Sequence, residues 1–168
     1  MAKFQKPVTL VAVLGLAHWF FGNLYEAFVF SPNWVVDSPE QMRRLNEFFV
    51  RSSPTLYFVP LTQLATFLVF YLYFSNRRED VRSQYRNAAL FALAATFVNG
   101  FIVATLITKL FGADYARFGA NLTTYCARWN VFNVARMMCV AATIAPLFKA
   151  YLVLERTSAP VPASDVVV

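Results

Sequence analysis

Four apolar runs constrain what this chain can fold into more than any other feature. Each run holds close to the ~20 residues that a helix needs to cross a bilayer. They cover residues 8–30, 56–74, 88–108 and 131–154. Lipid offers the backbone no hydrogen-bond partners, so an apolar run of this length satisfies its N–H and C=O groups by folding as a helix. The runs predict an all-α fold: an integral membrane, antiparallel four-helix bundle.

Composition and charge agree with a membrane protein. The chain is 58% hydrophobic and 14% charged, whereas soluble domains average ~25% charged. Its net charge of +6 does not indicate nucleic-acid binding, because the basic residues flank the apolar runs. Eight of them fall on the side of the termini and six on the other, which favours cytoplasmic termini. The first run is too long for a signal peptide and lacks a small-residue cleavage site, so we expect it to remain as a span.

The segments outside the spans are predicted as follows. Residues 1–156 form a single four-span membrane domain, and residues 157–168 form a loose polar tail. In the long first loop, Met42, Leu45 and Phe48 recur at helical spacing between residues 39 and 51. This pattern predicts a short amphipathic helix that lies on the membrane or caps the bundle.

Ionisable residues inside the apolar runs point to a buried polar site. Arg136 lies in the fourth run, and Glu26 and His18 lie in the first. A charge at this depth costs ~2.5–3.5 kcal/mol on the insertion scale, so such a residue usually has a partner or a task. At a rise of ~1.5 Å per residue, Glu26 and Arg136 share one layer, while His18 and Asn99 lie nearer the midplane. The simplest pairing is Glu26 with Arg136, either as a structural ion pair or as part of a functional site.

Helical phase selects the side chains that share an interior face. At ~100° per residue, one narrow stripe on the fourth helix contains Trp129, Asn133 and Arg136. On the first helix a stripe of similar width contains Gly15, His18, Gly22, Tyr25 and Glu26. We therefore expect His18, Glu26 and Arg136 to be the candidate catalytic residues. The candidate ligand-binding residues are Asn23, Tyr25, Asn99, Trp129, Asn130 and Asn133.

Neither a metal nor a cofactor is predicted. His18 is the one histidine, which excludes a bis-histidine haem. Glu26 is eight residues away from it, about 12 Å along one helix, which is too far to chelate the same ion.

The start of the fourth helix resembles a known family. The segment 128–136 begins with Arg and Trp, places Asn133 and Arg136 three residues apart, and continues into an Ala-rich apolar run. It is similar to the anthrone-oxygenase-like family of small four-helix membrane proteins. The resemblance implies an oxygenase that acts on polycyclic aromatic substrates without a recognised metal or flavin, with Asn133 and Arg136 matching the family's pattern.

Three functions remain open at this point. The first is an enzyme, an oxygenase in the resembling family's manner, that handles a lipophilic aromatic molecule arriving from the bilayer; it predicts a cavity with His18 and Arg136 on its wall. The second is a non-catalytic accessory or assembly subunit, which predicts no cavity and a direct Glu26–Arg136 bond. The third is a small transporter or channel, which predicts polar lining on both sides of Asn99. The bilayer is a partner in each case, and a homo-oligomer or a membrane-protein partner fits any of them.

Overall fold

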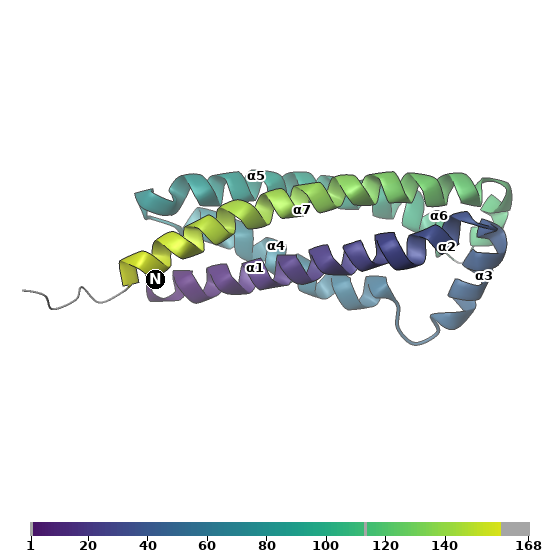
Figure 1. The fold of residues 1–168 in the computed structure, drawn as a ribbon, viewed down its shortest axis with the longest axis horizontal. Coiled ribbons are helices and arrows are strands. Elements are labelled where there is room, and N and C mark those ends of the chain that lie inside the picture. Colours follow the sequence, from purple (N-terminus) through teal and green to yellow (C-terminus); the bar gives the residue numbers. More distant parts are fainter. Residues whose placement is uncertain (1, 113, 159–168) are drawn as a thin grey trace, which may run out of the picture.

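The computed structural model describes residues 2–112 and 114–158, and this part of the chain is all helical, without strands (Figure 1). Four segments are long and apolar enough to cross a membrane: Phe4–Val35, Pro54–Ser75, Glu79–Leu110 and Tyr115–Thr157. They run lengthwise in an antiparallel bundle, with the N-terminus beside the end of the last helix. The chain is a multi-pass membrane protein with the predicted fold.

The first span is one continuous helical path with a change of winding. α1 (Ala2–Tyr25) passes into a π-helical turn (Glu26–Phe30) and then into α2 (Ser31–Val35). The chain turns at Asp37, whose φ of 51° is left-handed, a conformation that aspartate tolerates better than most residues. α3 (Ser38–Phe48) follows directly.

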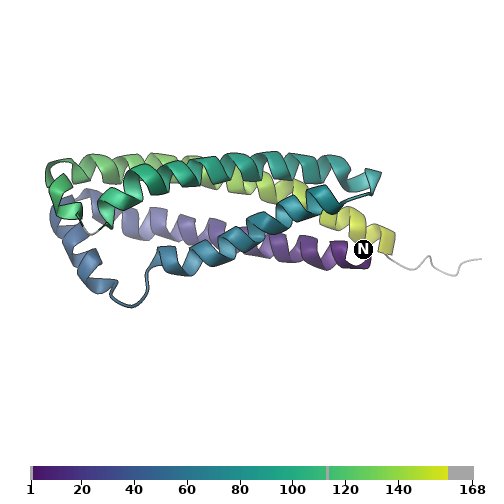
Figure 2. The same cartoon turned by 180° about the vertical axis from the view of Figure 1, so that it is seen from behind.

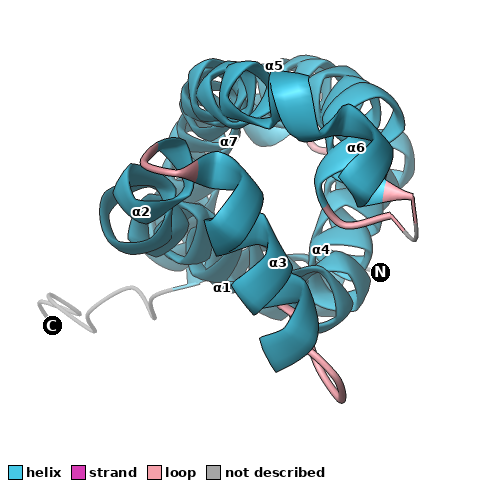
Figure 3. Cartoon of the chain, turned by 90° about the vertical axis from the view of Figure 1, so that its right-hand side faces the viewer, coloured by secondary structure: helices cyan, strands magenta, loops and turns pink. Residues whose placement is uncertain are grey.

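α3 is the amphipathic helix that the sequence predicts. Met42 is fully buried, while Arg43 and Arg44 are exposed and form ion pairs with Glu40. Asn46 Nδ2 donates to the backbone oxygen of Leu110 at 3.2 Å. The helix thus lies across part of the bundle end opposite the start of α1, as the end-on view shows (Figure 3).

The second and third spans are α4 (Pro54–Ser75) and α5 (Glu79–Ile102). α5 continues through a second π-helical turn (Val103–Ile107) into α6 (Thr108–Leu110). The third helix begins nine residues before the predicted position 88, so Arg82 and Arg86, which precede the apolar run, are helical. Glu79 and Asp80 favour this earlier start, because acidic side chains in the first turn complement the helix dipole.

A 3-10 segment (Tyr115–Asn121) leads into α7 (Leu122–Ser158), the longest helix. α7 begins before the apolar run at 131–154, because its first two turns are more polar but still helical. Of the predicted loose tail, Thr157 and Ser158 belong to α7. Residues 159–168 lie outside the described part of the chain.

The four helices are not equally close along their length. Small buried side chains, including Ala88, Ala92 and Ala95, line the contact of α5 with α7, and small residues let membrane helices approach closely. α4 instead diverges from α5 toward the end that α3 covers (Figure 2). The candidate site lies in this wider half of the bundle.

Candidate functional site

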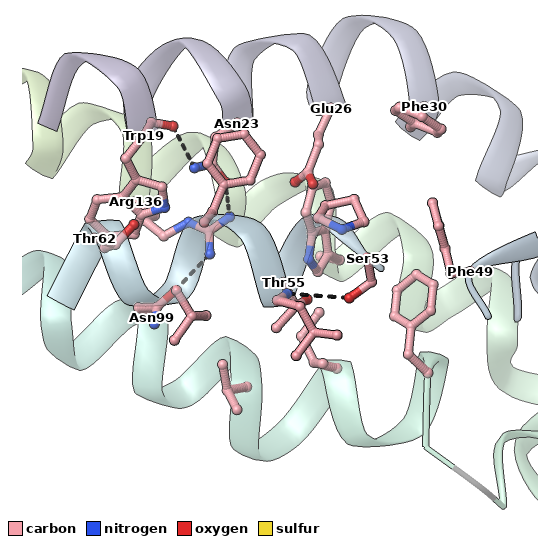
Figure 4. Close-up of a pocket in the computed structure, with 18 of the residues that line it drawn as sticks. Trp19, Asn23, Glu26, Phe30, Phe49, Ser53, Thr55, Thr62, Asn99 and Arg136 are labelled. Carbon is pink, nitrogen blue, oxygen red and sulfur yellow. Dashed lines mark hydrogen bonds between the residues drawn. The ribbon is translucent and has the colours of Figure 1, made fainter. Parts of the chain in front are cut away.

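Arg136 lies at the centre of a cluster of asparagine side chains from three helices. Its Nη1 donates to Asn99 Oδ1 of α5 at 2.7 Å, and its Nη2 donates to Asn133 Oδ1 at 2.7 Å and to Asn23 Oδ1 of α1. Figure 4 shows the guanidinium between Asn23 and Asn99. We call Asn23, Asn99 and Asn133 the amide cage. They supply the partners that a charged group at membrane depth needs.

The cage is itself held by backbone and aromatic contacts. Asn23 Nδ2 donates to the backbone oxygen of Trp19 at 2.8 Å, and Asn133 Nδ2 donates to the backbone oxygen of Asn23 at 3.3 Å. The Trp19 ring lies 5.7 Å from the guanidinium carbon, in cation–π range. Arg136 is 7% exposed and Asn133 is fully buried. The guanidinium is therefore fixed in position.

The predicted interior stripe of the fourth helix is confirmed. Trp129, Asn133, Arg136, Val140 and Thr143 are all buried, at 8% exposure or less. Asn130 lies beside this stripe and accepts a hydrogen bond from Ser31 Oγ, which ties α2 to α7. Neither Asn130 nor Asn133 lies on the cavity wall described below, so both support the site without lining it.

The expected Glu26–Arg136 ion pair is wrong. Among the described residues, no ion pair within 4.0 Å involves either side chain. The amide cage already binds both terminal nitrogens of Arg136, which removes the need for a carboxylate. Glu26 opens the π-helical turn of the first span and is partly buried. Its carboxylate extends from that helix into the cavity (Figure 4).

The interior stripe predicted for the first helix is also wrong in part. His18 and Tyr25 are exposed on the outside of the bundle, Tyr25 by 56%. The buried positions are instead Ala12, Leu16, Trp19 and Asn23. At ~100° per residue this face lies about a quarter turn from the predicted one. Glu26 is close enough to both faces to line the cavity.

His18 is consequently separated from Arg136. Its ring packs against Tyr57 and Phe58 of α4, with centroid distances of 5.5 and 5.2 Å. It lines a shallow outer groove between α1 and α4 with Gly15 and Ala65. A Cβ at Gly22 would overlap the Phe58 ring. The glycines on this face therefore serve the close approach of α1 and α4 and do not make room for a ligand.

A cavity of about 370 Å³ lies beside the amide cage. Its wall comes from all four spans and from α3. All three tryptophans of the chain, Trp19, Trp34 and Trp129, line it, together with Asn23, Glu26, Asn99 and Arg136. Thr62 of α4 also lines it, while Phe58 and Val59 of α4 and Val103 and Ile107 of the second π-helical turn complete much of the apolar wall. Its size is at the low end for a small-molecule site, ~300–1,000 Å³.

Hydrogen-bond donors without a partner gather on this wall. Among the described buried side-chain atoms, five lack a hydrogen-bond partner, and four of these belong to cavity residues. The four are Trp34 Nε1, Thr62 Oγ1, Trp129 Nε1 and Arg136 Nε. Leaving a buried polar group unpaired costs ~1–3 kcal/mol. Each of these atoms is itself buried, so a molecule in the cavity that offers oxygen acceptors would recover that free energy where the side chain turns its polar atom toward it.

Sequence reasoning missed three of the wall residues. Trp19 was not among the candidate residues, but it is 6% exposed and its ring lies beside the Arg136 guanidinium. Trp34 drew no attention in the loop, yet its ring lies 4.7 Å from that of Trp129. Thr62 lies in the second apolar run, where no candidate residue was predicted. The usable signal was the spacing of Trp19 and Asn23, which is one helical turn.

Among the described residues, no three His, Cys, Asp or Glu side chains are close enough to hold a metal ion. In comparisons with protein-family models, curated proteins and solved structures, nothing matched the chain. The functional argument therefore depends on the geometry of the cavity.

Proposed function

We propose that this membrane protein binds a lipophilic small molecule in the cavity beside Arg136 and handles its oxygen-bearing end. The observation that supports the proposal is the set of four unpartnered polar groups on the wall of an otherwise largely apolar cavity. Binding sites for small molecules usually combine such a wall with a few convergent polar groups.

The charges on the wall favour chemistry at an oxygen atom. Neutral amides hold Arg136, so its positive charge is not cancelled by a carboxylate in contact. A fixed cation with a free Nε–H stabilises the negative charge that develops on a carbonyl or phenol oxygen. Glu26 faces the same cavity and can accept a proton from the bound molecule. His18 faces away and takes no part in this proposal.

An oxygenase is the chemical form of the proposal that follows from the resemblance to the anthrone-oxygenase-like family. For anthrone, the ring methylene would react with dioxygen to give a ring carbonyl and one water molecule. Both methylene hydrogens and one oxygen atom leave as water, and the second oxygen atom stays on the ring carbon. Glu26 would take the first methylene proton, and Arg136 would stabilise the anthrone oxygen as it becomes an enolate. No other oxidant is required.

The test has a binding arm and a turnover arm. The protein in lipid nanodiscs is titrated with anthrone while tryptophan fluorescence, oxygen uptake and anthraquinone are followed. The proposal expects saturable quenching, because all three tryptophans line the cavity. It also expects matched oxygen uptake and anthraquinone formation above the rate in empty nanodiscs. Saturable binding without turnover would reject the oxygenase but keep the binding function. The absence of saturable binding would count against both.

The two alternative functions receive less support. An accessory subunit held by its polar layer predicts an ion pair between Glu26 and Arg136 and no void beside them. The described residues show no such ion pair, and both side chains line a cavity. A channel predicts polar lining on both sides of Asn99. Toward the termini, the interior is filled mainly by alanine, valine and leucine side chains.

We propose that both termini are cytoplasmic. The bundle end at which α1 begins and α7 ends also holds the loop between α4 and α5, with Arg77 and Arg78, and positive charge marks the cytoplasmic side. Fusing a reporter that is active on one side of the membrane to the N-terminus and to the loop at 50–53 tests this. We expect cytoplasmic activity from the first fusion and none from the second; the reverse pattern would contradict the orientation.

A further inference from the structure

The cavity has one apolar side whose residues are also exposed on the outside of the bundle. Leu56 and Val59 of α4 are 67% and 39% exposed, and Val103 of the second π-helical turn is 40% exposed. All three line the cavity. Leu56 and Val59 lie in the first turns of α4 and Val103 follows α5 directly, and these two helices diverge toward the end with α3 (Figure 2); we call this side the portal. Val59 and Val103 lie within segments that are long and apolar enough to cross a membrane, so we expect the portal to face lipid.

We infer that the portal admits an uncharged, single-chain amphiphile from the bilayer, whose oxygen-bearing head enters the cavity while its tail stays in the portal. The inference rests on the proposed binding of a lipophilic molecule with an oxygen-bearing end, independently of the oxygenase step with anthrone, and it specifies a class of ligand and its route. It commits to a neutral head with several oxygen acceptors, such as that of a monoacylglycerol.

The size of the cavity explains why the tail stays outside. About 370 Å³ is near the lower limit for a site that encloses a small molecule. A head group and the first few carbons of a chain fill such a volume. The rest of the chain then has to leave through an apolar opening, and the portal is lined by leucine and valine.

The charges of the wall explain why the head is uncharged. Arg136 and Glu26 both line the cavity, so their formal charges sum to zero. An anionic head that approached Arg136 would also meet Glu26, and a cationic head would meet Arg136. A neutral head with hydroxyl and carbonyl groups avoids both repulsions. It can accept from Trp34, Trp129 and Arg136 and donate to Glu26.

The helix winding supports an adjustable opening at this place. π-helical turns occur in two of the spans, at Glu26–Phe30 and Val103–Ile107, and both contribute cavity residues. Single π-helical turns are rare in proteins and are frequent at functional sites. Each one leaves the usual i to i−4 bonding of its helix incomplete, so the side chains there can shift at a lower cost.

Quenching of tryptophan by bromine tests the inference. The probe is a monoacylglycerol with a brominated acyl chain, added to the protein in nanodiscs of unbrominated lipid. Each tryptophan is at most 6% exposed, so a brominated chain in the surrounding lipid has little contact with them, and a chain in the portal has more. We expect saturable quenching of the wild type. Brominated fatty acid and brominated alkyl-trimethylammonium should quench less at the same concentration.

A double variant separates the portal from the cavity. Val59→Phe with Val103→Phe narrows the portal, and Val131→Phe with Val134→Phe places the same change on exposed positions of α7 away from the cavity. We expect the first pair to lose most of the saturable quenching and the second pair to keep it. If the first pair does not fold by circular dichroism, Leu56→Phe at the edge of the portal replaces it.

The outcomes are distinct. Equal quenching of the portal variant and the wild type overturns the inference, while saturable binding of anthrone would still uphold the proposed function. Strong quenching by aqueous acrylamide, with none by the brominated probe, also overturns it, because the opening would then face water. Stronger quenching by either charged probe rejects the neutral head. The absence of saturable quenching by the brominated probes and by anthrone would contradict the inference and the proposed function together.

Discussion

Replacing Asn99 with alanine tests whether the amide cage holds Arg136. The substitution removes the acceptor that lies 2.7 Å from Arg136 Nη1 and leaves a charged donor without that partner. A hydrogen bond to a charged group contributes ~1.5–3 kcal/mol in soluble proteins. Double-mutant cycles in a membrane protein average ~0.6 kcal/mol and reach ~1.7.

Asn99 also faces the cavity and is only partly buried, so water can replace some of the lost bond. We therefore expect a destabilisation of about 1–2 kcal/mol, which corresponds to a decrease in Tm of about 2–8 °C for a chain of this size.

The assay is thermal unfolding in detergent with a thiol-reactive dye, because Cys126 is fully buried and becomes reactive on unfolding. Thr96→Ala is the matched control, since Thr96 lies on the same helix and donates to the Ala92 oxygen within it at 2.8 Å. In the Arg136→Leu background, Asn99→Ala should lower Tm much less. The reasoning is refuted if Asn99→Ala behaves like the control, or if its effect is the same with and without Arg136.

Three further predictions follow from the placement of individual side chains. His18→Ala should leave anthrone binding and turnover unchanged, measured by fluorescence titration and oxygen uptake, because the ring lies outside the cavity; a large loss of either would return His18 to the site. Glu26→Gln should keep the fold and binding but reduce anthrone turnover by about 10²–10⁴-fold, as expected for loss of a general base; unchanged turnover would exclude that role. Gly22→Ala should destabilise by up to ~2 kcal/mol, because the overlap with Phe58 costs ~1–3 kcal/mol and the gain in helix propensity returns ~1. In a Phe58→Ala background the same change should stabilise, and destabilisation of similar size in both backgrounds would show that the overlap is not the cause.

The fold was predictable because lipid restricts the backbone to helices. The four spans were found from the length of the apolar runs, and the amphipathic helix at Ser38–Phe48 was found from the spacing of its apolar side chains. The start of α5 was missed, since charged residues such as Arg82 end an apolar run but do not end a helix. Helices extend beyond the hydrocarbon wherever acidic and basic residues are compatible with their termini.

The site was predictable on one helix and not on another. The stripe around Arg136 was correct because an asparagine and an arginine one turn apart have few options in lipid other than facing inward. On the first helix we took Gly15, Gly22 and His18 as markers of the interior. The glycines instead mark where α1 meets α4, and His18 packs beside them on aromatic rings. The orientation of a helix about its own axis depends on its neighbours, which the sequence of that helix alone does not contain.

The pairing within the site depended on competition between partners. Opposite charges at one depth suggested Glu26 and Arg136, but three amides surround the guanidinium first. Depth along a helix can be counted from sequence. Which of several polar groups at that depth reaches the arginine depends on angles that only the assembled bundle sets.

Direct observation of the tryptophan indole N–H groups would test the central claim, that the cavity binds an oxygen-bearing molecule through its unpartnered donors. The chain has three tryptophans, so ¹⁵N NMR of selectively labelled protein gives three indole signals, which Trp→Phe variants assign. On addition of anthrone we expect the Trp34 and Trp129 signals to shift saturably downfield, as a hydrogen bond to oxygen requires, with a smaller change at Trp19. Signals that stay unchanged at saturating anthrone would contradict the account.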